Sequence, residues 1–168
     1  MRVLGVDPGL DRTGYGVIEL QEHAGPRLIE AGLVRTRKEQ TLPHRLAIIA
    51  CQLKRIISLH EPDLVAVEDL YSYYKTPKPA ILMGHVRGVV LGTAALMEIP
   101  VASYLPTRIK QSVVGAGHAT KSQVARLVQA RLGLKEEQVP ADVTDALAVA
   151  LCHMDAAPAR KIRMALSR

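Results

Sequence analysis

The pattern of apolar and polar residues at the start of the chain predicts three strands. Residues 2–7 are a short, mostly apolar run that ends at Pro8-Gly9, which is typical of a buried strand closed by a turn. Residues 13–20 and 27–35 are two further strand candidates. The Gly25-Pro26 pair between them is a turn signal, so the two segments are expected to form a hairpin.

Helices and strands alternate in the rest of the predicted chain. Apolar residues recur at helical spacing over 42–60, and Thr41 is the candidate N-cap of that helix. The continuous apolar run 64–67, which ends at Glu68-Asp69, is typical of a buried parallel strand. The remaining elements are predicted as a helix over 79–98, a strand over 101–104 and helices over 106–114, 120–133 and 141–154. This order predicts an α/β fold with a mixed five-stranded sheet flanked by helices.

The composition indicates one domain with an anionic partner. The 168 residues are enough for a single core, and 22 Lys and Arg against 16 Asp and Glu give a net charge of +6. Cys51 and Cys152 are too few for a disulfide framework, indicate a reducing compartment and are expected to be buried packing residues. With neither a signal-peptide pattern nor an apolar stretch of about 18 residues, the chain is predicted to be cytoplasmic, without membrane association.

The positive charge is concentrated in the middle of the chain. Residues 70–135 carry a net charge of +8, whereas residues 1–69 and 136–168 each carry −1. The basic residues of the middle segment are Lys75, Lys78, Arg87, Arg108, Lys110, Lys121, Arg126, Arg131 and Lys135. A solvated basic surface would also account for this pattern. The near absence of balancing acids favours a phosphate-binding face.

Four carboxylates are predicted to meet at one edge of the sheet. Asp7 ends the first strand and Glu68 the fourth, so both side chains emerge at the same edge if these strands are parallel neighbours. Asp142 and Asp145 are three residues apart on the last helix and share a face. Hard oxygen ligands of this kind suit Mg²⁺ or Mn²⁺. Two such ions can support phosphodiester hydrolysis.

Each of these residues also has a purely structural interpretation. Asp7 precedes Pro-Gly and could be a turn residue, Glu68 could be a polar residue where a strand reaches solvent, and Asp142 could be a helix N-cap. His153 on the last helix is expected to be a partly buried structural residue. His118, in a Gly-flanked loop, is a candidate for ligand contact.

Four segments together carry a resemblance to a known family. They are GVDPGLDRTGYGVI (5–18), AVEDLY (66–71), IKQSVVGAGHATKSQV (109–124) and DVTDALAVALCH (142–153). In order and spacing they resemble the RuvC family of Holliday-junction resolvases over about the first 155 residues. The resemblance implies a ribonuclease-H-like nuclease domain over 1–155, which leaves 156–168 as a basic C-terminal tail that we expect to be flexible.

The resemblance also implies the activity and its partners. It implies a homodimeric endodeoxyribonuclease that makes paired symmetric nicks in four-way DNA junctions during homologous recombination and DNA repair. Two Mg²⁺ ions per active site, replaceable by Mn²⁺, are implied as cofactors. Branch-migration proteins of the RuvA and RuvB families are implied as partners.

The family's functional residues carry over to matching positions of this chain. The catalytic and metal-binding carboxylates would be Asp7, Glu68, Asp142 and Asp145. Some members carry His at the position of Asp142. Tyr71 falls where the family has an aromatic residue that stacks on bases, and Lys110 and Lys121 match basic residues that contact the DNA backbone.

Three alternatives share part of this pattern. A nuclease of the ribosomal-RNA-processing type has the same opening segment. An actin-like or sugar-kinase domain would use Asp7-Pro8-Gly9 and Thr13-Gly14 to cradle phosphate, but such proteins need two domains of this kind. A non-catalytic DNA-binding module would leave four acidic side chains facing DNA without a metal, and that arrangement is repulsive.

Overall fold

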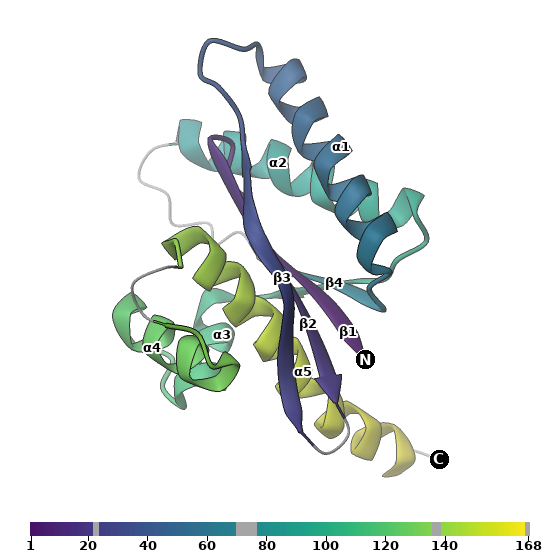
Figure 1. Cartoon of the computed structure of the whole chain (residues 1–168), viewed down its shortest axis with the longest axis vertical. Coiled ribbons are helices and arrows are strands. Elements are labelled where there is room, and N and C mark those ends of the chain that lie inside the picture. Colours follow the sequence, from purple (N-terminus) through teal and green to yellow (C-terminus); the bar gives the residue numbers. More distant parts are fainter. Residues whose placement is uncertain (22–23, 70–76, 136–138, 167–168) are drawn as a thin grey trace.

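The centre of the fold is one mixed sheet of five strands (Figure 1). The computed structural model describes residues 1–21, 24–69, 77–135 and 139–166, in the last range with side chains up to residue 156. The strands are β1 (Arg2–Asp7), β2 (Arg12–Gln21), β3 (Gly25–Arg35), β4 (Leu64–Glu68) and β5 (Val101–Tyr104), in the order β3-β2-β1-β4-β5. The first three strands are antiparallel neighbours, whereas β4 runs parallel to both β1 and β5.

Helices cover both faces of the sheet. They are α1 (Leu42–His60), α2 (Pro77–Leu96), α3 (Pro106–Val114), α4 (Lys121–Leu132) and α5 (Ala141–Leu166). One buried cluster joins α1 and α2 to the sheet, and a second joins α3, α4 and α5 to the opposite face. Figure 1 shows these two groups of helices on the two sides of the strands. The α/β architecture predicted from the sequence is confirmed.

The two-residue period of the central strands decides which side chains face α5. In β1, Leu4 and Val6 belong to the cluster under α1 and α2, whereas Val3 belongs to the cluster under α5. In β4, Val65 and Val67 alternate in the same way with Ala66. The same alternation places the last residues of β1 and β4 on the α5 face of the sheet.

Glycines let α5 lie directly on the sheet. A Cβ atom at Gly5 of β1 would lie 2.1 Å from the Ala146 carbonyl oxygen, and one at Gly14 of β2 would lie 1.9 Å from the Asp142 carbonyl oxygen. Neither distance is possible for a real side chain, so both positions require glycine at this helix separation. The first turn of α5 is therefore held at a fixed place over β1 and β2.

Three local predictions need correction. Gly25 and Pro26 are the first residues of β3, paired with Gln21 and Leu20, rather than the turn of the hairpin. Thr41 occupies the N-cap position of α1, but its side chain accepts no cap hydrogen bond. Cys51 is exposed on α1, because it lies outside the buried stripe of that helix.

Other local predictions agree with the structure or remain open. Cys152 is buried as expected. The helix α5 continues to Leu166, twelve residues beyond its expected end, into the segment 156–168. The flexibility of that segment and the division at residue 155 stay predictions.

The helix α2 is unusually apolar for its exposure. The expectation that the chain has no apolar stretch of about 18 residues is wrong for this helix: its segment Pro79–Leu96 is long and apolar enough to cross a membrane by length and composition alone, and 17% of the segment is buried within the chain. Ile81 and Leu96 expose 58% and 88% of their surfaces. The helix also packs on α1 and carries Arg87, which forms an ion pair with Asp69 and donates to the Ser103 Oγ. A helix that pairs with another protein surface has this character.

Candidate active site

Asp7 and Glu68 lie side by side at the carboxyl ends of β1 and β4. The two strands are parallel, and their register pairs Val6 with Val67, so the next residue of each strand is a carboxylate. Both strands alternate so that these two side chains face α5. The predicted meeting of Asp7 and Glu68 at one sheet edge is therefore present in the structure.

The first turns of α5 add the other two carboxylates. Asp142 and Asp145 come from the part of α5 that Gly14 and Gly5 hold against the sheet. All four carboxylates, with Arg12 and Lys121, line one cavity of about 360 Å³. Asp142 lies inside the first turn of the helix, and its carboxylate faces this cavity.

The cavity concentrates negative charge. Burial, together with repulsion by Asp145, Glu68 and Asp142, raises the pKa of Asp7 to about 7. Burial and the charge of Asp145 also raise the pKa of Glu68 above its usual value. Asp7 and Glu68 are therefore poised to gain stabilisation from a cation, and four carboxylates are the hard oxygen donors that Mg²⁺ and Mn²⁺ prefer.

Two basic side chains already neutralise part of this charge. Lys121 Nζ donates a hydrogen bond of 2.8 Å to Asp145 Oδ2, and this bond raises the pKa of Lys121. Arg12 Nε lies 3.1 Å from Asp142 Oδ2. Among the residues that the structure describes, no three acidic, His or Cys side chains are close enough together to hold a metal ion. The four carboxylates are the kind of donor that a divalent cation prefers, but Asp142 and Asp145 contact cationic side chains of the protein itself, and the four would have to move closer together to hold an ion.

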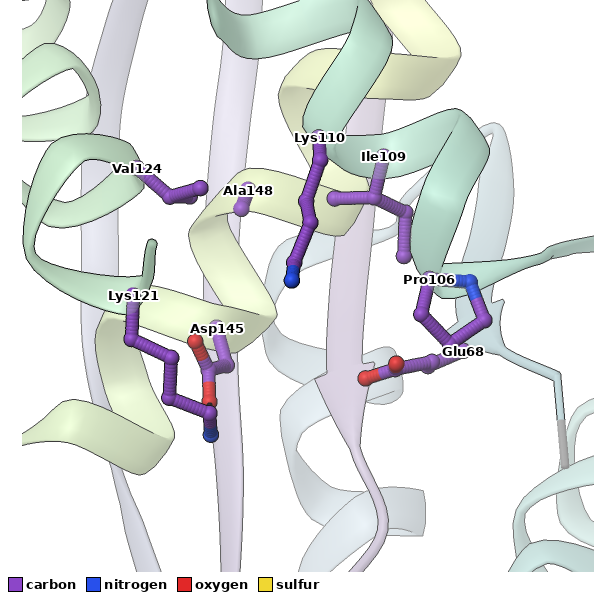
Figure 2. A pocket seen from close by; sticks show the side chains of 8 residues that line it. All are labelled: Glu68, Pro106, Ile109, Lys110, Lys121, Val124, Asp145 and Ala148. Atoms are coloured by element: carbon purple, nitrogen blue, oxygen red, sulfur yellow. Dashed lines mark hydrogen bonds and ion pairs between the residues drawn. The ribbon is translucent and has the colours of Figure 1, made fainter. Parts of the chain in front are cut away.

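The two predicted lysines approach the carboxylates from α3 and α4. Figure 2 shows both lysines beside a smaller cavity of about 170 Å³, which Glu68 and Asp145 also line. The capping box of α4, in which Thr120 accepts from the Gln123 backbone and the Gln123 side chain accepts from the Thr120 backbone, fixes the turn that carries Lys121. Lys110 lies on α3, and its charge lowers the pKa of Glu68 against the opposing effects.

Comparison with known proteins agrees with this arrangement. Residues 3–153 match the family model described as crossover junction endodeoxyribonuclease RuvC. The chain belongs to this family. Its similarity to the crossover junction endodeoxyribonuclease RuvC of Rhodopirellula baltica is 47% identity over 152 residues, covering 89% of this chain and 84% of that protein. The RuvC of Caldicellulosiruptor saccharolyticus is 42% identical over 154 residues, covering 92% of each chain.

Solved structures of RuvC proteins have the same fold. The Thermus thermophilus RuvC structure is 35% identical, with a TM-score of 0.86 over 95% of this chain and 96% of that one. T. thermophilus RuvC in complex with a Holliday junction substrate gives 35% identity and a TM-score of 0.87, with 94% of each chain covered. The fold is thus ribonuclease-H-like, as in other RuvC resolvases. Membership of this family favours the junction nuclease over the alternatives that share only the opening segment.

The remaining candidate residues differ in what the structure says of them. Tyr71 lies outside the described residues, so its stacking role stays a prediction. His118 is exposed, and its role as a ligand contact also stays a prediction. His153 is buried, and its Nδ1 lies 2.7 Å from the Tyr104 hydroxyl, which agrees with a structural role.

Sequence reasoning missed Arg12. The residue stands five positions after Asp7, but its proximity to Asp142 arises from the packing of β2 under α5 and is not a spacing that the sequence displays. The one available signal is its position immediately before Thr13-Gly14, within the segment that carries the family resemblance.

Proposed function

We propose that this protein resolves four-way DNA junctions by paired symmetric nicks, hydrolysing phosphodiester bonds at the cavity of the four carboxylates. The observation that carries the proposal is the meeting of Asp7, Glu68, Asp142 and Asp145 in one cavity of a chain that belongs to the RuvC family. A relative at 35% identity has been solved with a Holliday junction substrate. That activity serves homologous recombination and DNA repair.

The four carboxylates would hold the metal ions of the reaction. Membership of this nuclease family implies dependence on a divalent metal, and we propose two Mg²⁺ per site, with Mn²⁺ as a substitute. When bound, the metals supply Lewis-acid activation of a water and neutralise charge that develops on the phosphate. Asp7 would be one of the residues that hold the metal, because it lies among the other three carboxylates, and burial and their charge raise its pKa.

The basic residues around the cavity would hold the DNA strand. Lys110 and Lys121 lie beside the carboxylates, where they can contact the phosphates that flank the cleaved bond and offset their charge. Tyr71 is proposed to stack on bases near the junction centre. The net charge of +8 over residues 70–135 supports binding to the DNA backbone in general.

A homodimer would explain both the symmetry of the cuts and the surface of α2. Four-way junctions have two symmetry-related strands, and a two-fold dimer offers one active site to each. The exposed apolar side chains of α2 are the surface that we propose to join the two copies. RuvA-type and RuvB-type branch-migration proteins remain proposed partners, and the cytoplasm the proposed location.

Incubation with three labelled substrates tests the class of activity. The protein is mixed with a synthetic four-way junction, a linear duplex of the same sequence and an RNA duplex, each with and without Mg²⁺. We expect paired nicks at symmetric positions of the junction, and only with Mg²⁺. Equal cutting of the linear duplex, or cutting of RNA instead, would contradict the proposal.

A further inference from the structure

Arg12 contacts Asp142 of α5, one of the four carboxylates of the candidate active site. Its Nε lies 3.1 Å from Asp142 Oδ2, and both residues line the cavity of the four carboxylates. The Arg12 side chain is 56% exposed and that of Asp142 is 28% exposed, so the pair sits at the mouth of the cavity. The guanidinium keeps its charge at every physiological pH and cannot itself ligate a metal.

The position of Arg12 is fixed from both sides in the chain. Asp11, the preceding residue, forms an ion pair with the buried guanidinium of Arg45 on α1. Thr13, the following residue, donates from its Oγ1 to the Gly9 carbonyl oxygen at 2.7 Å. Gly14 then packs against the backbone of Asp142 itself. Residues 9–14 and the first turn of α5 are thus held in a fixed relative position, which keeps Arg12 close to Asp142.

Arg12 and a metal ion would compete for Asp142. The Asp142 carboxylate contacts the Arg12 guanidinium, and a divalent cation held by the same carboxylate would be repelled by that guanidinium at close range. We propose that Arg12 is a positioning residue that restrains Asp142 in the DNA-free protein and thereby weakens divalent-cation binding at the four carboxylates. This inference rests on the proposed function, since it assumes that the carboxylates bind metal.

Mn²⁺ binding to the DNA-free protein tests this inference without any nuclease assay. The full chain is titrated with Mn²⁺, and free Mn²⁺ is measured by its electron paramagnetic resonance signal. The test variant is Arg12→Gln. The matched control is Arg27→Gln, because Arg27 is also an exposed arginine in an ion pair, with Glu19 at 3.3 Å, but lies on β3 outside the cavity. Both substitutions are repeated in an Asp142→Asn background, and thermal unfolding verifies that each variant is folded.

The expected result is specific to the Arg12–Asp142 pair. Arg12→Gln should bind Mn²⁺ about two- to fivefold tighter than the unmodified protein, the range expected for losing an exposed ion pair. Arg27→Gln should leave the affinity unchanged. The gain should vanish in the Asp142→Asn background, because a double-mutant cycle isolates the pairwise contribution.

Two results would contradict the role of Arg12 but leave the proposed metal site intact, and a third would contradict the metal site itself. An unchanged or weaker Mn²⁺ affinity in Arg12→Gln would show that Arg12 does not restrain Asp142. A gain that persists in Asp142→Asn would show a general charge effect instead. If Glu68→Gln bound Mn²⁺ as tightly as the unmodified protein, the proposed metal site would fail, and the inference with it.

Discussion

Asp7 lies among three other carboxylates, and its ionisation is opposed both by burial and by their charge. Lys121 contacts Asp145, and Arg12 contacts Asp142, so these two carboxylates have cationic partners within the protein. The positive charge of these partners offsets little of the repulsion at Asp7, whose pKa remains raised to about 7. A site of this kind gives up folding stability in its metal-free state. A divalent cation held by these carboxylates would restore that stability, because it would bind the folded chain in preference to the unfolded one.

The raised pKa of Asp7 predicts a pH-dependent stability in the absence of metal. The folded state holds the Asp7 proton more tightly than the unfolded state, so stability falls as pH rises from about 4 to about 7 and stays reduced above that. Asp7→Asn removes this penalty and should stabilise the metal-free protein at pH 8 by on the order of 2 kcal/mol. At pH 4 the gain should be small. Urea unfolding at both values measures it, and an equal gain at pH 4 and pH 8 would contradict the assignment.

Lys121 is expected to contribute one phosphate contact as well as its hydrogen bond to Asp145. Lys121→Ala should therefore weaken junction binding and lower the slope of log affinity against log salt by about 1. The control is Lys54→Ala, because Lys54 is an exposed lysine on α1, outside both cavities of the site. Fluorescence anisotropy with Ca²⁺ in place of Mg²⁺ gives both slopes. An unaltered slope for Lys121→Ala would argue against a phosphate contact.

At the scale of elements, the sequence was informative wherever a hydrophobic period existed. The bounds of β1 and β5 follow from short apolar runs between turn residues, and the first residues of α1 and α4 follow from Thr and Pro signals. The end of α5 could not be predicted, because the apolar periodicity stops near Met154, although the helix continues to Leu166. In the site, the sequence predicted the carboxylates at the strand ends, Asp7 and Glu68, and the pair at helical spacing, Asp142 and Asp145.

What the sequence could not show is contact between distant segments. The ion pair of Arg12 with Asp142 depends on how closely β2 and α5 approach, and the hydrogen bond of Lys121 with Asp145 depends on the angle between α4 and α5. Neither is a spacing along the chain. The four carboxylates could be assigned to one edge from the sequence, whereas the contacts of Asp142 with Arg12 and of Asp145 with Lys121 required the structure.

The close approach of β2 and α5 predicts the effect of a single methyl group. Gly14→Ala places a Cβ where the Asp142 carbonyl oxygen lies, so the first turn of α5 must move. We expect a loss of about 1–3 kcal/mol in the free energy of unfolding and a loss of cleavage out of proportion to it. Gly117→Ala is the control, since its Cβ would lie 3.5 Å from the Thr107 carbonyl oxygen, an ordinary contact. Full cleavage by Gly14→Ala would contradict this account of α5.

At the scale of the whole molecule, the two lysines beside the site and the exposed apolar side chains of α2 lie on opposite sides of the sheet. The segment with a net charge of +8 lies between Glu68 and Asp142 in the sequence, and two of its basic residues, Lys110 and Lys121, line the cavities of the site. The exposed apolar side chains of α2 lie on the opposite face of the sheet from α3, α4 and α5. We therefore propose that DNA binds on the side of α3, α4 and α5 and that a second copy of the chain binds at the exposed apolar side chains of α2.

The proposed dimer surface predicts a change of oligomeric state. Leu96→Glu replaces the most exposed large apolar side chain of α2 by a charge and should convert the proposed dimer to a monomer. Leu59→Glu is the control, because Leu59 is 64% exposed but lies on α1. Sedimentation velocity measures both, and circular dichroism verifies the fold. The variant Ile81→Glu is measured separately in the same way. A dimer that persists in both variants would exclude α2 as the interface.

The central claim is that the four carboxylates cut junction DNA, and Glu68→Gln tests it most directly. The change keeps the shape of the side chain and removes one charge from the cavity. The control Glu61→Gln makes the same change at an exposed residue that precedes the first residue of β4. Single-turnover cleavage of a labelled four-way junction in Mg²⁺ is measured at equal DNA occupancy. The account predicts that Glu68→Gln binds the junction and fails to cut it, whereas Glu61→Gln cuts normally. Normal, paired nicking by Glu68→Gln would contradict it.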